Sequence, residues 1–409
     1  MTFFDALETR EARERERELL ERLPGQIAHA QSKSAYYAKL LAGIDVGAVR
    51  TRAALAALPV TRKADLLELQ KAMPPFGGLN ATPLSGLARI FMSPGPIYEP
   101  EGRKPDYWRS ARALHACGFR KGDVVVNCYS YHLSPAASMF ETGLHRLGCA
   151  VIPAGVGQTE QQARLVADIR PRGYVGTPSF LKIILEKADE LGLASDSIER
   201  ALVSGEAFLP PVRQFLAERG LQAFQAYGTA DLGLLAYETE AREGLVLDEE
   251  ILLEIVRPGT GDPVAEGEVG EVVATTFNED YPLVRFATGD LSAVLAGRSP
   301  CGRTNVRIKG WMGRADQTTK VRGLFVHPQQ VAEVLRRHAL ARGRLVVENE
   351  DGEDRMTLRI EHSGTGDETL AKTIEATLRE VTKMRGEARF VAVGALPNDG
   401  KVIEDARKY

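Results

Sequence analysis

Between residues 124 and 218, short apolar runs alternate with longer segments of helical spacing, and this alternation constrains the fold more than any other feature of the sequence. Parallel strands must be joined by a crossover connection, usually a helix, so the alternation predicts parallel βαβ units and an α/β fold. In such sheets, ligands bind beyond the carboxyl ends of the strands. The predicted strands are 124–128, 150–153, 173–176 and 201–204, and the predicted helices are 136–147, 161–169, 181–191 and 211–218.

The N-terminal part is predicted to be helical. Alternating charges and an apolar stripe favour a helix over 5–23, which Pro24 and Gly25 are expected to end. A second helix is predicted over 26–41, and Thr61 is predicted to be the N-cap of a third. The Pro- and Gly-rich stretch 73–105 is not expected to be regular for long.

The pattern changes after residue 250. Two β-branched runs, 250–256 and 268–277, flank the turn cluster 258–263 and predict an antiparallel subdomain. Beyond Gly313, strands near 345–347, 356–360 and 390–393 and a helix over 368–381 predict a separate α+β unit. The sequence therefore predicts a domain of residues 1–314 and a smaller one of residues 315–409.

Composition argues against two classes of partner. With 52 basic and 55 acidic residues and a net charge of -3, the chain lacks the positive field that nucleic-acid binding requires. No run approaches the roughly 18 apolar residues of a membrane helix, and the N-terminus has no apolar signal core. Four widely spaced cysteines are typical of reduced thiols. These observations favour a cytoplasmic protein with neither a nucleic-acid nor a membrane partner.

Two segments combine a turn with ligand-binding groups. In the first, Gln225 to Asp231, a glycine follows Tyr227, and the Thr229 hydroxyl and the Asp231 carboxylate can contact phosphate or Mg²⁺. In the second, Arg285 to Leu291, a carboxylate follows a tight turn and can accept two ribose hydroxyls. Taken alone, Tyr227 is more typical of a core residue and Asp290 of a turn residue.

Further short motifs follow in the same order as in a known group of enzymes. They include Leu58 to Leu66, Gly118 to Asn127, Val151 to Gly155, Cys301 to Thr304, Gly313 to Asp316, Lys320 to Gly323 and Pro397 to Lys401. Together with the two turn segments, this set resembles the phenylacetate–CoA ligase branch of the adenylate-forming superfamily, over nearly the whole chain.

The resemblance implies a fold and a reaction. The implied fold is a large N-terminal domain of parallel βαβ units with a β subdomain, followed by a small, mobile α+β lid. The implied reaction is adenylation of a carboxylic acid by Mg-ATP, followed by transfer of the acyl group to coenzyme A. The implied partners are the acid and coenzyme A, and the resemblance is compatible with a homodimer.

The resemblance also assigns roles to individual residues. Tyr227 and Gly228 belong to the adenine-binding turn, with Tyr227 stacked on the base. Thr229 contacts phosphate, and Asp231 occupies the position of a Mg²⁺-binding glutamate. The other expected adenosine contacts are Ser204, Gly205, Glu206 and Ala207 along the adenine edge, and Asp290 and Arg314 on the ribose.

Two further roles belong to the C-terminal part of the chain. Asp316 matches the hinge about which the lid rotates between the two half-reactions. Lys401 matches the lysine that steadies the carboxylate and the α-phosphate during adenylation. A compact ammonium suits that role, because it can offset the charge that develops on the reacting oxygens.

The chain departs from the family in its phosphate loop. The family places a Ser/Thr/Gly-rich loop that ends in lysine after the first Pro/Gly-rich region, whereas this chain has Ser93-Pro94-Gly95-Pro96. Proline has no N–H to donate, and Glu99 and Glu101 are expected to repel a polyphosphate. Ala230 also lacks the family's hydroxyl.

The resemblance further bears on zinc and on the acid. Relatives carry cysteines in a Cys-Pro-Cys-Gly element and after the Tyr-Gly turn, where this chain has Ser299 and Thr239, so Cys301 alone cannot complete a tetrahedral site and no structural zinc is expected. The family's acyl-binding aromatics match Tyr129, Tyr131 and His132, which favours an aryl or small apolar acid. His132 is as typical of a merely packed side chain as of a polar determinant of the substrate or a gate.

Three interpretations follow from the sequence. The first is an acid–CoA ligase. The second, favoured by the altered phosphate loop, is a degenerate protein that binds AMP or acyl-CoA without ligase activity. The third is an adenylating enzyme with an acceptor other than coenzyme A.

Overall fold

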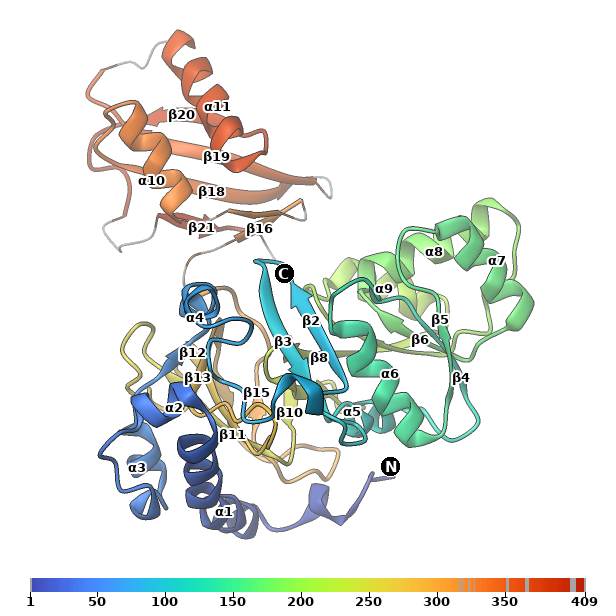
Figure 1. Ribbon diagram of the computed structural model, residues 1–409. Helices are drawn as coiled ribbons and strands as arrows, with labels where there is room; N and C mark the ends of the chain where they lie inside the picture. Colours follow the sequence, from blue (N-terminus) through green and yellow to red (C-terminus); the bar gives the residue numbers. More distant parts are fainter. Residues whose placement is uncertain are drawn as a thin grey trace. The chain divides into compact units, whose positions relative to one another are not determined.

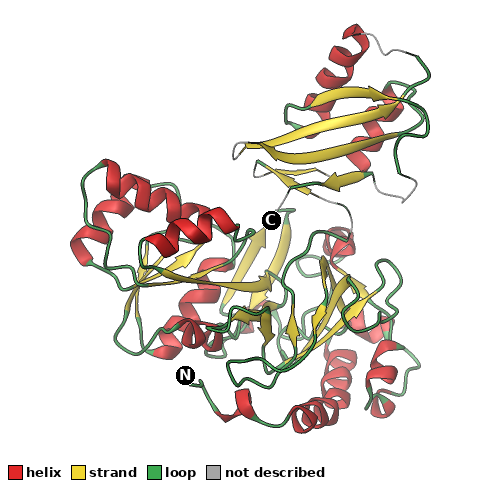
Figure 2. Cartoon of the chain, turned by 180° about the vertical axis from the view of Figure 1, so that it is seen from behind, coloured by secondary structure: helices red, strands yellow, loops and turns green. Residues whose placement is uncertain are grey.

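The computed structural model describes residues 2–315, 317, 319–322, 324–326, 328–350, 353–364, 368–397 and 402–407. The chain divides into two compact units, Met1–Trp311 and Met312–Tyr409. The domain boundary predicted after residue 314 stays a prediction. The predicted α/β class is confirmed (Figures 1 and 2).

A nine-stranded sheet forms the centre of the first unit, in the order β14-β15-β10-β9-β8-β7-β6-β4-β5. The five strands from β8 to β5 are parallel to one another, as the alternation of strand and helix predicts. The remaining strands continue the sheet in antiparallel pairing. Its strands are β4 (Val124–Asn127), β5 (Ala150–Pro153), β6 (Gly173–Gly176), β7 (Arg200–Val203), β8 (Gln222–Thr229), β9 (Gly233–Glu238), β10 (Leu245–Leu247), β14 (Val294–Leu295) and β15 (Arg307–Ile308).

Side-chain alternation along the parallel strands assigns the helices to the two faces of the sheet. Val125 and Leu202 pack into one core cluster with α5 and α6, whereas Val126 and Val203 pack into another with α7, α8 and α9. Because both faces are covered, the parallel strands are apolar over most of their length. The helices are α5 (Ala111–Cys117), α6 (Ala136–Leu147), α7 (Thr159–Ile169), α8 (Pro178–Glu190) and α9 (Pro210–Glu218).

The predicted β subdomain is a four-stranded sheet in the order β1-β13-β12-β11. Strand β1 (Thr61–Arg62) pairs in parallel with β13 (Phe286–Ser292), which pairs with β12 (Gly270–Thr276), and β12 pairs with β11 (Ile251–Val256). The buried Arg285 guanidinium donates to Glu254 and to the carbonyl oxygens of Ala56 and Leu58. These contacts hold the segment before β1 against the start of β13.

The sequence prediction for Thr61 is wrong. Thr61 and Arg62 form a strand, the 3-10 turn η3 (Lys63–Asp65) follows, and α4 (Leu66–Ala72) begins without a side-chain cap. The Thr61 hydroxyl instead donates to the hydroxyl of buried Tyr37. Pairing with a distant strand therefore outweighs the local capping preference.

The N-terminal helix prediction is also wrong at its end. One helix, α1 (Ala12–Lys33), runs through Pro24, and shorter elements flank it: η1 (Ala6–Thr9), α2 (Ala35–Leu40), η2 (Val46–Ala48) and α3 (Arg52–Ala56). Leu19, Leu23, Ile27 and Ala30 form a continuous buried stripe on α1. Packing of this stripe on both sides of Pro24 offsets the hydrogen bond that proline cannot make.

The Pro- and Gly-rich region contains a hairpin that the sequence did not predict. Strands β2 (Arg89–Ser93) and β3 (Ile97–Glu101) pair antiparallel and follow the 3-10 turn η4 (Leu84–Gly86). Pro100 is tolerated because a two-stranded ribbon leaves one edge of each strand unpaired.

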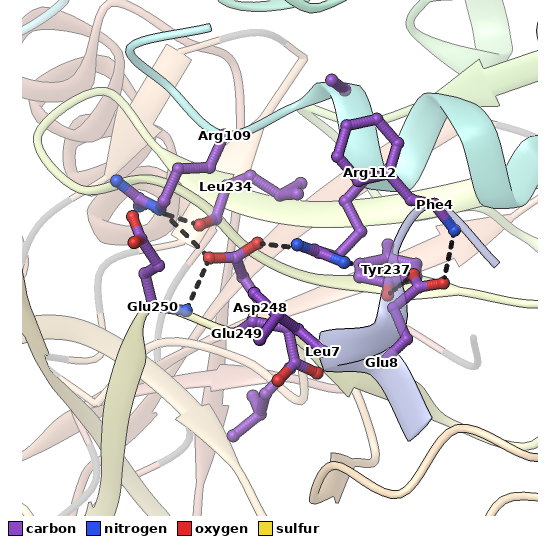
Figure 3. A network of polar contacts seen from close by, with 12 residues as sticks. Phe4, Leu7, Glu8, Arg109, Arg112, Leu234, Tyr237, Asp248, Glu249 and Glu250 are labelled. Atoms are coloured by element: carbon purple, nitrogen blue, oxygen red, sulfur yellow. Dashed lines mark hydrogen bonds and ion pairs between the residues drawn. The ribbon is translucent and has the colours of Figure 1, made fainter. Parts of the chain in front are cut away.

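A buried network of charges ties the N-terminal segment to β9 and β10 (Figure 3). Glu8, which has no exposed surface, accepts from the Tyr237 hydroxyl at 3.0 Å and forms an ion pair with Arg303 at 3.1 Å. Asp248 forms ion pairs with Arg109 at 3.3 Å and with Arg112 at 3.8 Å. We assign this network to structural stability, because its groups are paired with one another.

The second unit contains a four-stranded sheet in the order β20-β19-β18-β21, with helices α10 and α11 against one face (Figures 1 and 2). The predicted strands and the predicted helix are present, and α10, the β16–β17 hairpin and β21 are additional. The elements are β16 (Thr319–Val321), β17 (Leu324–Val326), α10 (Pro328–Arg337), β18 (Gly343–Glu350), β19 (Glu353–Glu361), α11 (Glu368–Thr382), β20 (Glu387–Val391) and β21 (Ile403–Asp405). Among the helices in the described part of the chain, none has the length and apolarity to span a membrane.

Candidate adenylate site

The two turn segments singled out from the sequence meet in the structure. The Tyr227 hydroxyl at the end of β8 donates to Oδ2 of Asp290 in β13 at 3.0 Å. Nε1 of Trp311 donates to Oδ1 of the same carboxylate at 3.1 Å. Both Tyr227 and Asp290 are buried. The Asp290 carboxylate is therefore held in one orientation, beside an aromatic ring, at the carboxyl end of a parallel strand.

A second carboxylate of the same turn has a basic partner. Nζ of Lys63 donates to Oδ2 of Asp231 at 2.5 Å. Burial acts to lower the pKa of Lys63, but the charges of Asp231, Glu99 and Asp290 outweigh it and raise the pKa. Lys63 is therefore a cation that shares one electrostatic field with three carboxyl groups.

Pairing of β1 with β13 explains why Lys63 lies here. Residues Thr61 and Arg62 are aligned with Phe286 and Ala287, so the next residue along the chain is carried toward Asp290. Sequence reasoning missed Lys63. It belongs to one of the quoted motifs, Leu58 to Leu66, but was interpreted only as part of a capped helix start.

The turn that carries Asp231 depends on glycine. A Cβ atom on Gly228 would lie 2.6 Å from the carbonyl oxygen of Gly233, so no larger residue fits the β8–β9 hairpin at this point. The Thr229 hydroxyl accepts from the Leu232 N–H at 3.1 Å. Both Thr229 and Ala230 are partly exposed, and both can reach a ligand over the turn.

Asp231 fits the Mg²⁺ role that the resemblance assigns to it. Its Oδ1 atom is buried and has no hydrogen-bond partner among the described residues, while Lys63 occupies Oδ2. A carboxylate oxygen is a ligand that Mg²⁺ prefers. No cluster of three or more His, Cys, Asp or Glu side chains suited to a metal occurs in the described part of the chain, so the other ligands would be phosphate oxygens and water.

The two acidic residues of β3 are both buried and both hydrogen-bonded within the protein. Glu101 is buried, and it accepts from Trp108 Nε1 at 2.9 Å and from Arg89, so its charge is compensated within the protein. Glu99 has no exposed surface, and its carboxyl group contacts Ser93. Burial and the neighbouring charge of Asp231 raise the pKa of Glu99 to about 8.

The adenine-edge segment follows β7 directly. Ser204 and Ala207 are partly buried, while Gly205 and Glu206 are exposed. Oε1 of Glu206 accepts from the Ser179 N–H at 2.7 Å, at the start of α8. The segment thus lies at the carboxyl edge of the parallel strands, as does the Tyr227 turn on the adjacent strand.

The three residues predicted to bind the acid have different environments. Tyr129 is buried, its ring is stacked on Phe140 at 5.0 Å between centroids, and it lies beside Gly205. Tyr131 is 39% exposed and donates to Glu141 at 2.5 Å, and His132 is exposed. Only Tyr129 therefore adjoins the adenine-edge segment through described contacts.

The remaining predicted site residues belong to the second unit. Arg314 is partly buried, near the start of that unit. Asp316 and Lys401 lie outside the described residues. The residues that follow them in the sequence are described: the N–H of Val402 donates to Oε1 of Gln317 at 2.6 Å.

The residues from which no structural zinc site is expected form a hydrogen-bonded group. Oγ of Ser299 lies 3.0 Å from Sγ of Cys301, and all four cysteines are unpaired and buried. Burial alone would raise the pKa of Cys301, but hydrogen bonds from Ser299, Thr239 and Arg303 lower it. The expectation of no structural zinc stays a prediction.

Comparisons with a family model and with individual relatives agree on the kind of enzyme that this chain resembles. A family model described as AMP-binding enzyme matches residues 107–277. The phenylacetate-coenzyme A ligase of Thermus thermophilus is 32% identical over 364 residues, which are 84% of this chain and 80% of the relative. The corresponding ligase of Aromatoleum evansii is 30% identical over 361 residues, with 84% and 80% of the two chains covered.

Solved structures extend the similarity to nearly the whole chain. A crystal structure of 2-hydroxyisobutyryl-CoA ligase, in complex with 2-HIB-AMP and CoA, matches with a TM-score of 0.77 and 25% identity, over 98% of this chain and 92% of that one. The fold and the matches define an adenylate-forming enzyme of the acid–thiol ligase class. Within that class, the chain belongs to the phenylacetate–coenzyme A ligase family.

Proposed function

We propose that this chain is an ATP-dependent acid–CoA ligase that forms an acyl-adenylate from an aryl or small apolar carboxylic acid and passes the acyl group to coenzyme A. The observation that carries the proposal is the Tyr227–Asp290 hydrogen bond next to the Lys63–Asp231 ion pair. These contacts unite a nucleoside-binding carboxylate and a phosphate-binding turn in one electrostatic field.

In the proposed adenosine site, Asp290 binds the ribose. Its two oxygens accept from Tyr227 and Trp311, and a carboxylate oxygen can accept more than one hydrogen bond, so a ribose hydroxyl can donate to it as well. The Tyr227 ring stacks on the adenine base, and Ser204 to Ala207 line the edge of the base. Arg314 is the proposed second ribose contact.

In the proposed phosphate site, Lys63 and Asp231 act on the reacting centre. The acid's carboxylate attacks the α-phosphorus, and pyrophosphate leaves with the electrons of the broken P–O bond. Lys63 offsets the negative charge that develops there, and Thr229 hydrogen-bonds a phosphate oxygen. Mg²⁺ bound at Asp231 would supply further charge neutralisation on the phosphates.

The second half-reaction transfers the acyl group. The thiolate of coenzyme A attacks the acyl carbonyl carbon, and AMP leaves as the carbonyl re-forms. We propose that Lys401 serves the first half-reaction and that the second unit rotates about Asp316 before the second. Tyr129, Tyr131 and His132 are the proposed acid-binding residues, and the names of the relatives, which act on phenylacetate, support an aryl acid.

The test is carboxylate-dependent formation of AMP from ATP, assayed across aryl and short-chain acids with and without coenzyme A. A ligase releases AMP and forms a thioester only when acid and coenzyme A are both present. It exchanges pyrophosphate into ATP when the acid is present without coenzyme A. If neither activity appears with any acid, the ligase proposal fails. AMP release that needs an amine or a carrier protein instead would identify an enzyme with another acceptor.

One observation favours a second candidate function. Because a buried carboxyl group contacts Ser93 in the phosphate loop, a degenerate protein that binds AMP or acyl-CoA without ligase activity is the alternative. Calorimetry separates the two candidates, because a degenerate protein binds AMP or coenzyme A but does not bind Mg-ATP.

Two further properties belong to this proposal. A cytoplasmic location is supported by four buried, unpaired cysteines, which are typical of a reducing compartment. A homodimer is tested by light scattering of the purified protein.

A further inference from the structure

Both hydrogen-bond donors of Ser93 are used within the protein. The Ser93 N–H donates to Oε2 of Glu99 at 3.2 Å, and the Ser93 hydroxyl donates to Oε1 of the same group. Ser93 is 8% exposed and Glu99 is 0% exposed. A carboxyl group of the chain therefore takes the two donors with which this loop could bind a phosphate.

The tip of the hairpin offers little to replace them. Pro94 and Pro96 have no N–H, and Gly95 between them has φ of 139°, a conformation that favours glycine. Ser93 is thus the residue of this loop that can donate both a backbone and a side-chain hydrogen bond.

The Glu99 carboxyl group belongs to the same electrostatic cluster as the proposed phosphate site. Burial and the charge of Asp231 disfavour its ionisation, whereas Lys63 and the two bonds from Ser93 favour it. Lys63 in turn is bonded to Asp231. Glu99 therefore interacts electrostatically with both members of the Lys63–Asp231 pair while it is bonded to Ser93.

Other contacts hold the hairpin in this arrangement. The side chain of Gln70 donates to the carbonyl oxygen of Tyr98 at 2.9 Å and accepts from its N–H at 2.8 Å. On the other strand, the N–H of Met92 donates to the carbonyl oxygen of Leu133 at 2.8 Å. Because both strands are fixed by neighbouring elements, Glu99 is held at Ser93.

We propose that Glu99 is a specificity-determining residue that occupies the place of the nucleotide's outer phosphates and so weakens the binding of triphosphate and pyrophosphate relative to AMP. This inference rests on the proposed nucleotide site. Binding of Mg-ATP must free Ser93 from Glu99, whereas AMP carries no outer phosphates and leaves the contact intact. The same competition speeds the departure of pyrophosphate after adenylation.

The experiment compares the dissociation constants of AMP and Mg-ATP, measured by calorimetry, in the natural protein and in Glu99→Gln. An amide keeps the shape of the side chain but has a single acceptor oxygen, so it cannot accept from both the N–H and the hydroxyl of Ser93. The expected result is about a tenfold or greater gain in affinity for Mg-ATP, with AMP binding changed by less than about twofold. An unchanged ratio of the two constants would overturn the proposal.

Glu101→Gln is the matched control. It makes the same change on the same buried strand, but Glu101 bonds Trp108 and Arg89 instead of Ser93, so the ratio is expected to stay at the natural value. If no variant binds any adenine nucleotide, the proposed function itself fails. If AMP binds normally and the ratio does not respond to Glu99→Gln, only the present inference fails.

Ser93→Ala tests the mechanism. In a double-mutant cycle, the gain produced by Glu99→Gln should shrink when Ser93 is already alanine, because the freed hydroxyl is then missing. Equal gains with serine and with alanine at position 93 would show that the Ser93 hydroxyl does not contribute to the gain in affinity for Mg-ATP. Thermal unfolding identifies any variant that does not fold, and in that case Glu99→Asp, which shortens the side chain, must give a smaller gain of the same sign.

Discussion

The ammonium group of Lys63 lies 2.5 Å from Oδ2 of Asp231, although the two residues are far apart in the sequence. Asp231 has a fully buried side chain, whereas that of Lys63 is 24% exposed. The pair connects the edge of the β subdomain to the turn after the last parallel strand.

Replacement of Lys63 by methionine should leave the Asp231 carboxylate buried without its cation. We expect the free energy of unfolding of the first unit to fall by about 3 kcal/mol, as for other broken buried pairs. Adenylation should be slowed, and raised Mg²⁺ should recover part of the rate because both Asp231 oxygens become available. Urea unfolding and pyrophosphate exchange measure the two effects. Lys71→Met, which breaks an exposed pair with Glu68, is the control and should change neither.

Tyr227→Phe should separate the ring from its hydroxyl. The aromatic surface remains, but the Asp290 carboxylate loses the Tyr227 hydroxyl as an orienting donor. We expect the KM for ATP to rise several-fold and stability to fall by about 1–2 kcal/mol. Steady-state kinetics at saturating acid tests this. Tyr98→Phe, on a side chain that is 38% exposed, should leave KM unchanged, and an equal effect there would refute a role for the Tyr227 hydroxyl.

Stability should depend on pH through Glu99. The pKa of this residue is about 8 in the folded chain, against an ordinary value of 4.5. Between these values the native state holds a proton that the unfolded state has released, so the free energy of unfolding falls as pH rises from 4.5 to 8. Urea titrations across that range should show a shallower fall in Glu99→Gln than in the natural protein. Parallel curves for the two proteins would contradict the assignment.

Glu8→Ala should destabilise the first unit strongly. The change leaves Arg303 buried without its carboxylate. It also removes the acceptor of the Tyr237 hydroxyl (Figure 3). We expect a loss of about 3–5 kcal/mol in the free energy of unfolding. Glu11→Ala on the exposed pair with Arg298 is the control and should have no measurable effect.

Removal of metal should not alter the fold around Cys301. One thiol with Ser299 and Thr239 cannot complete a tetrahedral zinc site. Elemental analysis of purified protein should find less than one zinc per chain, and EDTA should leave the thermal unfolding curve unchanged. Stoichiometric zinc, or a chelator-induced shift, would reverse this expectation.

The parallel core was predictable because its strands, such as Val124–Asn127, are short apolar runs that alternate with segments of helical spacing. The proximity of Tyr227 and Asp290 was expected only from the order of motifs, since neither residue is distinctive alone, and the hydrogen bond between them was not predicted. Lys63 was missed because its position depends on Thr61 pairing with Phe286, and no local pattern encodes a two-residue strand with so distant a partner. The Ser93–Glu99 contact was missed because the prolines of this region argue against regular structure, so the hairpin that brings the two residues together was not predicted.

The parallel pairing of β1 with β13 also affects how the protein is made. While the ribosome synthesises the chain, residues 61–62 have no partner until residues 286–287 emerge, after the whole parallel sheet. Contacts of such long sequence separation form slowly, because a large loop must close first. The nascent chain can therefore complete its βαβ core early, but it acquires the Lys63 cation beside Asp231 only near the end of translation of the first unit.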